Sequence, residues 1–134
     1  MTETRRASAA LERFARETLG SQCAPEVFSR VEDSATPLPG LPEVRRRIAI
    51  GGRLLIYVVE VPDAASAVAL MGHWVTAGRA ERDERGMNRL RLVVSLNDPT
   101  PASVAAVEDA FSRLQGLDER VHLHVLAAEA VAGI

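Results

Sequence analysis

The sequence predicts an α/β fold: a single domain with a mixed β-sheet of about four to five strands, helices packed on it, and a preceding N-terminal helix. Short runs of Val, Leu and Ile alternate with longer segments whose apolar residues recur at helical spacing. Gly51-Gly52 joins two of the apolar runs, which indicates an antiparallel hairpin. The later strands are separated by helix-length segments, which indicates parallel crossovers beside that hairpin.

Length and composition restrict the class of protein. A chain of 134 residues, 47% hydrophobic and 25% charged, is typical of one globular domain over residues 1–134. We expect a cytoplasmic protein, because no apolar signal core or membrane span is recognisable and Cys23 is the only cysteine. A net charge of −2 disfavours nucleic acid as a partner. All 16 basic residues are arginine, which is typical of a GC-rich bacterial genome.

The N-terminal third predicts a helix, a short strand and a loop. Apolar residues recur at helical spacing within 5–19 and Gly20 follows them, so we predict a helix over 1–20, ahead of an α/β core over 44–134. Alternation within 23–33 indicates a short strand. Prolines and a glycine make 34–42 a loop.

Residues 44–61 form the predicted hairpin. Gly51-Gly52 suits a two-residue turn with positive φ, and the apolar run 54–59 predicts a central strand. By alternation, one face of the first arm should hold Val44, Arg46, Ile48 and Ile50.

Two helices and two strands complete the predicted core. Asp63 is the expected N-cap of a helix ending near Gly78, and the charged residues 79–89 are expected to form a solvated connector. A buried strand over 90–96 follows. Thr100 before a proline then begins a helix to about residue 115. Residues 120–126 alternate as a last strand, and 127–134 begin another helix.

This order of elements resembles the STAS domain of bacterial anti-sigma-factor antagonists. The resemblance is topological and rests on the hairpin, the helix 63–78, the strand 90–96 with its loop 97–101, the next helix and the strand 120–126. It implies a non-enzymatic regulatory module, in which a partner kinase phosphorylates a serine or threonine of that loop. The matching positions are Thr100 and Ser103. The family's acidic-Ser-Ser-Gly loop is replaced here by Asp98-Pro99-Thr100-Pro101.

The predicted binding site is the loop 97–103, because ligands of α/β folds usually bind beyond the carboxyl ends of strands. Free N–H groups at the helix start also attract anions. Ser103, three residues into the helix, is not expected to be needed for the cap. The residues proposed for binding are Asn97, Asp98, Thr100 and Ser103.

The expected partner of this loop is a protein, such as a kinase or another regulatory protein, and we assign no catalytic residue, metal or cofactor. Two alternatives remain open. One is a small-molecule or phosphate-binding domain, including an enzyme, that uses the same loop. The other is a structural subunit that forms a homo-oligomer through the N-terminal helix.

Other candidate sites have simpler structural interpretations. His122 and His124 share one strand face and could ligate a metal, but the polar face of a half-covered strand is the favoured explanation. Arg45-Arg46-Arg47 could bind an acidic partner, but alternation splits the three residues across two faces. Cys23 has no histidine near it in the sequence to activate it.

An acidic metal site of nuclease type is also disfavoured. The chain has no lysine to complete it, and the hairpin alone is not expected to bring two of the four acidic residues together on one face. These four are Glu43, Glu60, Asp63 and Asp98. Met71 and Trp74 fall on an apolar helix stripe and are expected in the core.

Overall fold

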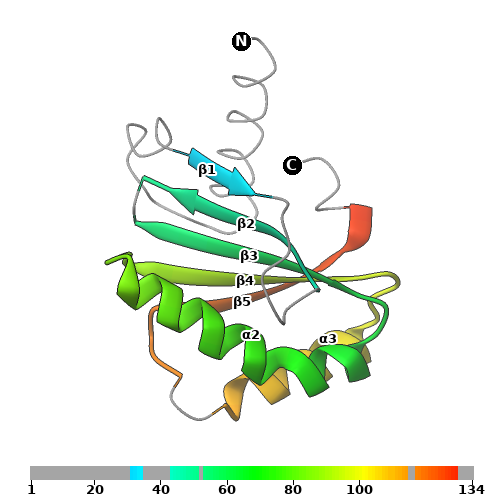
Figure 1. Cartoon of the computed structure of the whole chain (residues 1–134). Coiled ribbons are helices and arrows are strands. Elements are labelled where there is room, and N and C mark those ends of the chain that lie inside the picture. Colours follow the sequence, from blue (N-terminus) through cyan, green and yellow to red (C-terminus); the bar gives the residue numbers. More distant parts are fainter. Residues whose placement is uncertain (1–30, 35–42, 52, 115–116, 130–134) are drawn as a thin grey trace.

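The computed structural model describes residues 31–34, 43–51, 53–114 and 117–129. These residues form a five-stranded mixed sheet with two helices on one face, which confirms the predicted α/β class (Figure 1). The predicted helix over 1–20, residues 23–30 of the first strand and residues 130–134 lie outside the described residues.

The strand order is β1-β2-β3-β4-β5. The pairs β1–β2 and β2–β3 are antiparallel, whereas β3–β4 and β4–β5 are parallel. The two crossovers lead from β3 to β4 and from β4 to β5, so both advance in the same direction across the sheet. Crossovers of the same hand then place α2 and α3 on the same face. In chain order the elements are β1 (Val31–Ser34), β2 (Val44–Ile50), β3 (Leu54–Val61), α2 (Ala64–Glu84), β4 (Arg89–Leu96), α3 (Pro101–Ser112) and β5 (Val121–Ala127).

The hairpin of β2 and β3 is present, and β3 is the middle strand of the sheet, as its apolar run predicts. The connection differs from the prediction. Ile50 pairs with Leu54, so three residues rather than two lie between the arms. Gly51 has a φ of 60°, which only glycine adopts readily.

The predicted face of Val44 is wrong, because β2 contains a β-bulge. The register shifts between Val44 and Arg46, and the extra residue reverses the alternation at that point. Val44 therefore joins the core under α2, together with Ala49. Ile48 and Ile50 face the opposite side of the sheet.

Helix α2 begins at the predicted N-cap, where the Asp63 carboxylate accepts a hydrogen bond from the Ser66 N–H at 2.8 Å. It does not end at Gly78. That glycine marks the closest approach of α2 to β4: a Cβ atom there would lie 2.6 Å from Cδ2 of Leu90. The sequence prediction took Gly78 for the end of the helix, whereas this glycine permits close packing of α2 on Leu90.

The end of α2 is a Schellman motif six residues later. Gly86 has a φ of 67°, and its N–H donates to the Asp83 carbonyl at 3.2 Å. The Met87 N–H donates to the Arg82 carbonyl at 2.8 Å, and Met87 is buried. These two bonds satisfy carbonyls that the helix leaves free at its last turn. Residues 79–84, predicted as a connector, are thus helical.

The two faces of the sheet are both apolar. On the first, Trp74 and Met71 of α2 pack against β3 and β4 without solvent exposure, as expected of core residues. Neither α2 nor α3 lies on the second face (Figure 1). Its buried apolar residues, each at most 2% exposed, are Ile48, Ile50, Leu54, Ile56, Val58 and Val93.

Candidate functional site

The predicted loop lies between β4 and the start of α3. Thr100 is the N-cap: its hydroxyl accepts a hydrogen bond from the Ser103 N–H at 3.1 Å. In return, the Ser103 hydroxyl accepts from the Thr100 N–H at 2.7 Å. This is a capping box, in which each residue satisfies the other's backbone. The expectation that the Ser103 hydroxyl is not needed for the cap is therefore wrong.

The four residues predicted for binding lie together on one exposed loop. Asn97, Asp98 and Thr100 are exposed, and Ser103 is half-buried. The loop follows the carboxyl end of β4, and β3 ends beside it, because Val61 pairs with Leu96. Helix α2 starts directly after β3, so the N-termini of both described helices lie at the carboxyl ends of the parallel strands (Figure 1).

A first cluster of charged side chains, absent from the sequence predictions, surrounds Glu81 of α2. One carboxylate oxygen accepts from the Tyr57 hydroxyl at 2.6 Å. The other accepts from Arg47 at 2.6 Å and from Arg85 at 3.2 Å. Burial alone would raise the pKa of Glu81, but the hydrogen bonds from Tyr57, Arg47 and Arg85 outweigh it and lower the pKa.

A second cluster joins α2 to the segment before β5. Arg82, 1% exposed at its side chain, donates to both carboxylate oxygens of Asp118 at 2.9 and 2.7 Å. Arg79 approaches the same carboxylate at 3.4 Å, and the Arg120 N–H donates to it at 2.9 Å. The hydrogen bonds from Arg82 hold the pKa of Asp118 well below its usual range. The hydrogen bond from the Arg120 N–H lowers this pKa further.

Both clusters join separate elements of the fold. Each carboxylate is surrounded by donors from other elements of the same chain, so its oxygens are used in holding α2 to the sheet or to the β5 segment. Sequence reasoning missed them because the partners that join separate elements are 24 to 39 residues apart. The only local signal was the concentration of charge in residues 79–85.

His122 and His124 lie on the second face, beside two arginines of β4. Arg89 and Arg91 each donate to the Nε2 atom of the adjacent histidine at 3.0 Å. Because a guanidinium has no acceptor, each Nε2 accepts, and the ring proton of the neutral imidazole is on Nδ1.

The charge state of these histidines follows from the same contacts. Burial is the main cause that lowers the pKa of His124 to about 4, and the positive charge of Arg91 is the second. The same two causes lower the pKa of His122. Both rings are therefore neutral near neutral pH, with Nε2 engaged. Within the described ranges, no three His, Cys, Asp or Glu side chains are grouped to hold a metal ion.

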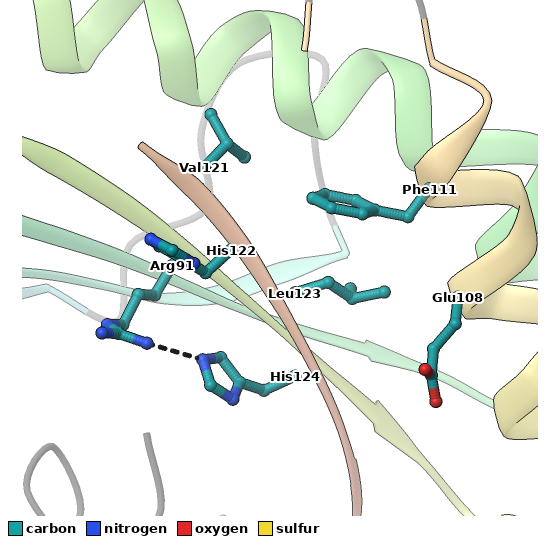
Figure 2. Close-up of a pocket in the computed structure, with 7 residues that line it drawn as sticks. All are labelled: Arg91, Glu108, Phe111, Val121, His122, Leu123 and His124. Carbon is teal, nitrogen blue, oxygen red and sulfur yellow. Dashed lines mark hydrogen bonds between the residues drawn. The ribbon is translucent and has the colours of Figure 1, made fainter. Parts of the chain in front are cut away.

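A pocket of about 310 Å³ lies at β5, outside the predicted loop. Figure 2 shows its lining residues on both sides of the strand. Phe111 and Glu108 of α3 lie on the side of Leu123, whereas Arg91 lies on the side of the histidines. The complete lining is Arg91, Glu108, Phe111, Val121, His122, Leu123 and His124.

The remaining candidates do not form a site in the described residues. Arg45 pairs at the surface with Glu60 at 3.3 Å, whereas Arg47 points to α2. Simple alternation would put these two arginines on one face, and the register shift between Val44 and Arg46 separates them. Contrary to expectation, Glu43 and Glu60 are neighbours, since the Glu60 N–H donates to the Glu43 carbonyl at 3.0 Å. Cys23 lies outside the described residues.

Comparisons with protein-family models, with curated proteins and with solved structures found no match. None of the described helices combines the length and the hydropathy needed to cross a membrane.

Proposed function

We propose that this chain is a non-enzymatic, STAS-like regulatory module that binds a protein partner through the loop 97–103. The observation that carries this proposal is the exposure of Asn97 and Asp98 directly before a helix start fixed by the reciprocal Thr100–Ser103 bonds. A fixed loop loses little conformational entropy on binding, which favours recognition.

The state of the ionisable residues also supports a binding module over an enzyme. Glu81, Asp118 and Tyr57 have shifted pKa values, and each is held by hydrogen bonds between elements of the fold. Catalytic acids and bases need to reach a substrate in a pocket. The pocket at β5 is lined by none of these three groups. Its two histidines also have lowered pKa values, but the Nε2 atom of each is bonded to an arginine of β4.

Phosphorylation of the loop would act through the capping box. The hydroxyls of Thr100 and Ser103 lie 3.1 Å apart and each bonds the other's backbone N–H. A phosphate on either oxygen would replace this reciprocal arrangement with a dianion at the N-terminus of α3, where N–H donors and the helix dipole favour it. A modification there would therefore change both the charge and the shape of the recognition surface.

The experiment begins with affinity capture of partners by the full chain, followed by binding measurements on variants. Asp98→Ala is the primary variant because its side chain is exposed and makes no hydrogen bond with another described residue. We expect partner binding at least tenfold weaker with an unchanged melting temperature. Glu119→Ala, also exposed but located before β5, is the matched control and should bind normally.

Ser103→Asp tests the switch. The aspartate can still accept the Thr100 N–H and suits the helix dipole, so the fold should persist while binding changes. Intact-mass analysis of protein from its native host provides an independent result: a phosphate supports the switch, whereas a retained ligand supports the small-molecule alternative. Unaltered partner binding in both Asp98→Ala and Ser103→Asp would refute the loop as recognition site.

A further inference from the structure

Strand β5 is at one end of the sheet and, within the described residues, pairs only with β4. The Leu90 N–H donates to the Arg120 carbonyl at 3.0 Å, which sets the alternation of the parallel ladder. By that alternation, the backbone groups of His122 and His124 point toward β4. Those of Leu123 and Val125 point away from it, toward the edge that no described strand occupies. This edge offers donors and acceptors at the spacing of another strand.

The pocket at β5 extends around this edge and has two chemically different sides (Figure 2). On the helix side, Phe111 and Leu123 are half-buried and apolar. On the other side, Arg91 and the two histidines form a polar wall. The side chains of any added strand would alternate between these two sides, because successive residues of a strand point to opposite faces.

Charge distinguishes the two sides further. The exposed Arg89, which donates to His122, brings a positive charge to the polar side, and the two histidines are neutral. The one carboxylate that lines the pocket, Glu108, is on the helix side. An acidic side chain is therefore attracted to the polar side and repelled from the helix side, which defines the register of a bound strand.

We propose that the edge of β5 is a docking site for an extended peptide segment of a partner protein in which acidic and apolar residues alternate. Main-chain hydrogen bonds to Leu123 and Val125 supply affinity, and the two sides of the pocket supply specificity. This surface lies apart from the loop 97–103, so the inference goes beyond the proposed function and does not depend on it.

The test uses the full chain and the blocked peptide acetyl-Glu-Val-Glu-Leu-Glu-Val-Glu-amide, with binding measured by calorimetry. A peptide of the same composition with its glutamates grouped at one end, and a peptide with arginine in place of glutamate, should each bind at least tenfold more weakly. Equal binding by all three would overturn the proposal, since neither alternation nor charge would then matter.

Two N-methylated peptides test the main-chain pairing without altering the protein. One is methylated at its apolar residues and the other at its glutamates, which removes the N–H donors on one edge of the peptide in each case. If the peptide adds antiparallel to β5, the N–H groups of its apolar residues, on the helix side, point to β5. If it adds parallel, the N–H groups of its glutamates point to β5 instead. We expect one methylated peptide to bind like the parent and the other to lose at least tenfold. Retention of binding by both would show that no strand is added.

Variants of the protein identify the polar side. Arg89→Gln removes an exposed charge beside His122 and should weaken peptide binding at least fivefold. Arg113→Gln, which removes an exposed charge at the end of α3, is the matched control and should have no effect. Asp98→Ala should also bind the peptide normally. The docking proposal for β5 and the proposal for the loop 97–103 can therefore fail independently of each other. If light scattering shows a dimer that excludes the peptide, the occupant is a second copy and the proposal is wrong.

Discussion

Arg82 and Asp118 form a bidentate ion pair that joins the last turn of α2 to the segment preceding β5. The two bonds are 2.9 and 2.7 Å long and connect residues 36 positions apart. The Arg82 side chain is 1% exposed, and that of Asp118 is 31% exposed. Arg82 also donates to the adjacent Asp83 at 3.0 Å, whereas its pair with Asp118 joins α2 to the segment before β5.

Replacement of Asp118 should therefore be costly. In Asp118→Ala, the Arg82 charge stays buried without this partner, and we expect the free energy of unfolding to fall by about 2–3 kcal/mol. Urea denaturation monitored by circular dichroism would measure the loss. Arg79→Ala is the control: it removes a longer, 3.4 Å contact to the same carboxylate from a partly exposed side chain. It should cost less than about 1 kcal/mol. Similar losses in both variants would contradict the assigned importance of Arg82.

The same pair predicts acid sensitivity. The hydrogen bonds from Arg82 hold the folded-state pKa of Asp118 below its ordinary value of 3.8. The folded protein thus binds fewer protons than the unfolded chain at low pH, so the stabilisation is fully present above about pH 5 and declines as the pH falls below about 4. The melting temperature should drop on acidification, and Asp118→Ala should show a smaller drop. Parallel pH profiles for the two proteins would exclude this carboxyl as the cause.

Two glycines of α2 should respond oppositely to alanine. At Gly78 a methyl group would lie 2.6 Å from Cδ2 of fully buried Leu90, so Gly78→Ala should destabilise the fold by about 1–3 kcal/mol. At Gly72 the nearest atom, Cδ2 of Leu114, would be 3.9 Å away. Gly72→Ala should therefore gain helix propensity and add up to about 1 kcal/mol. The melting temperatures of the pair provide the comparison, and stabilisation by both would show that α2 does not pack this closely on β4.

Tyr57 and Glu81 should be energetically coupled. Tyr57→Phe removes a 2.6 Å hydrogen bond to a carboxylate and should cost about 1.5–3 kcal/mol. Most of that cost should disappear when Glu81 is already alanine, which leaves the hydroxyl without this acceptor, and a double-mutant cycle would show it. Additive losses would mean that the hydroxyl contributes independently of the carboxylate.

A spectroscopic titration tests the same contact. Burial, and then the hydrogen bond to Glu81, raises the pKa of Tyr57 above its ordinary value of 10.0. The neutral phenol is thus favoured in the folded state, and this stabilisation is present below about pH 10 and is lost as the pH rises further. Tyr57 is the single tyrosine of the chain, so its phenolate absorbance can be followed directly. Ionisation of the folded protein near pH 10 would contradict the assigned environment.

The sequence predicted those elements whose signals are local. The apolar run of β3, the Asp63 cap and the Thr100-Pro101 start of α3 each depend on a few adjacent residues, and all three are present. The end of α2 was misplaced because Gly78 serves packing against Leu90, a contact between separate elements. The face of Val44 was wrong because a bulge depends on the pairing partner.

The candidate sites follow the same division. The position of the exposed loop 97–103 could be predicted, because turn residues and a helix start are local features. The role of Ser103 was missed because a capping box usually has Glu or Gln at that position. The two faces of β5 were predicted from its alternation. The pocket was not, since Arg91 and Phe111 reach it from β4 and α3.

The row of positive charge beside β5 also bears on aggregation. An open edge strand with apolar residues on one face is a template for edge-to-edge association of identical molecules. If two copies joined antiparallel along β5, each would place its Arg89 and Arg91 on the same face of the continued sheet, and like charges would oppose the association. Loss of these arginines would therefore remove a protection against self-association and favour precipitation.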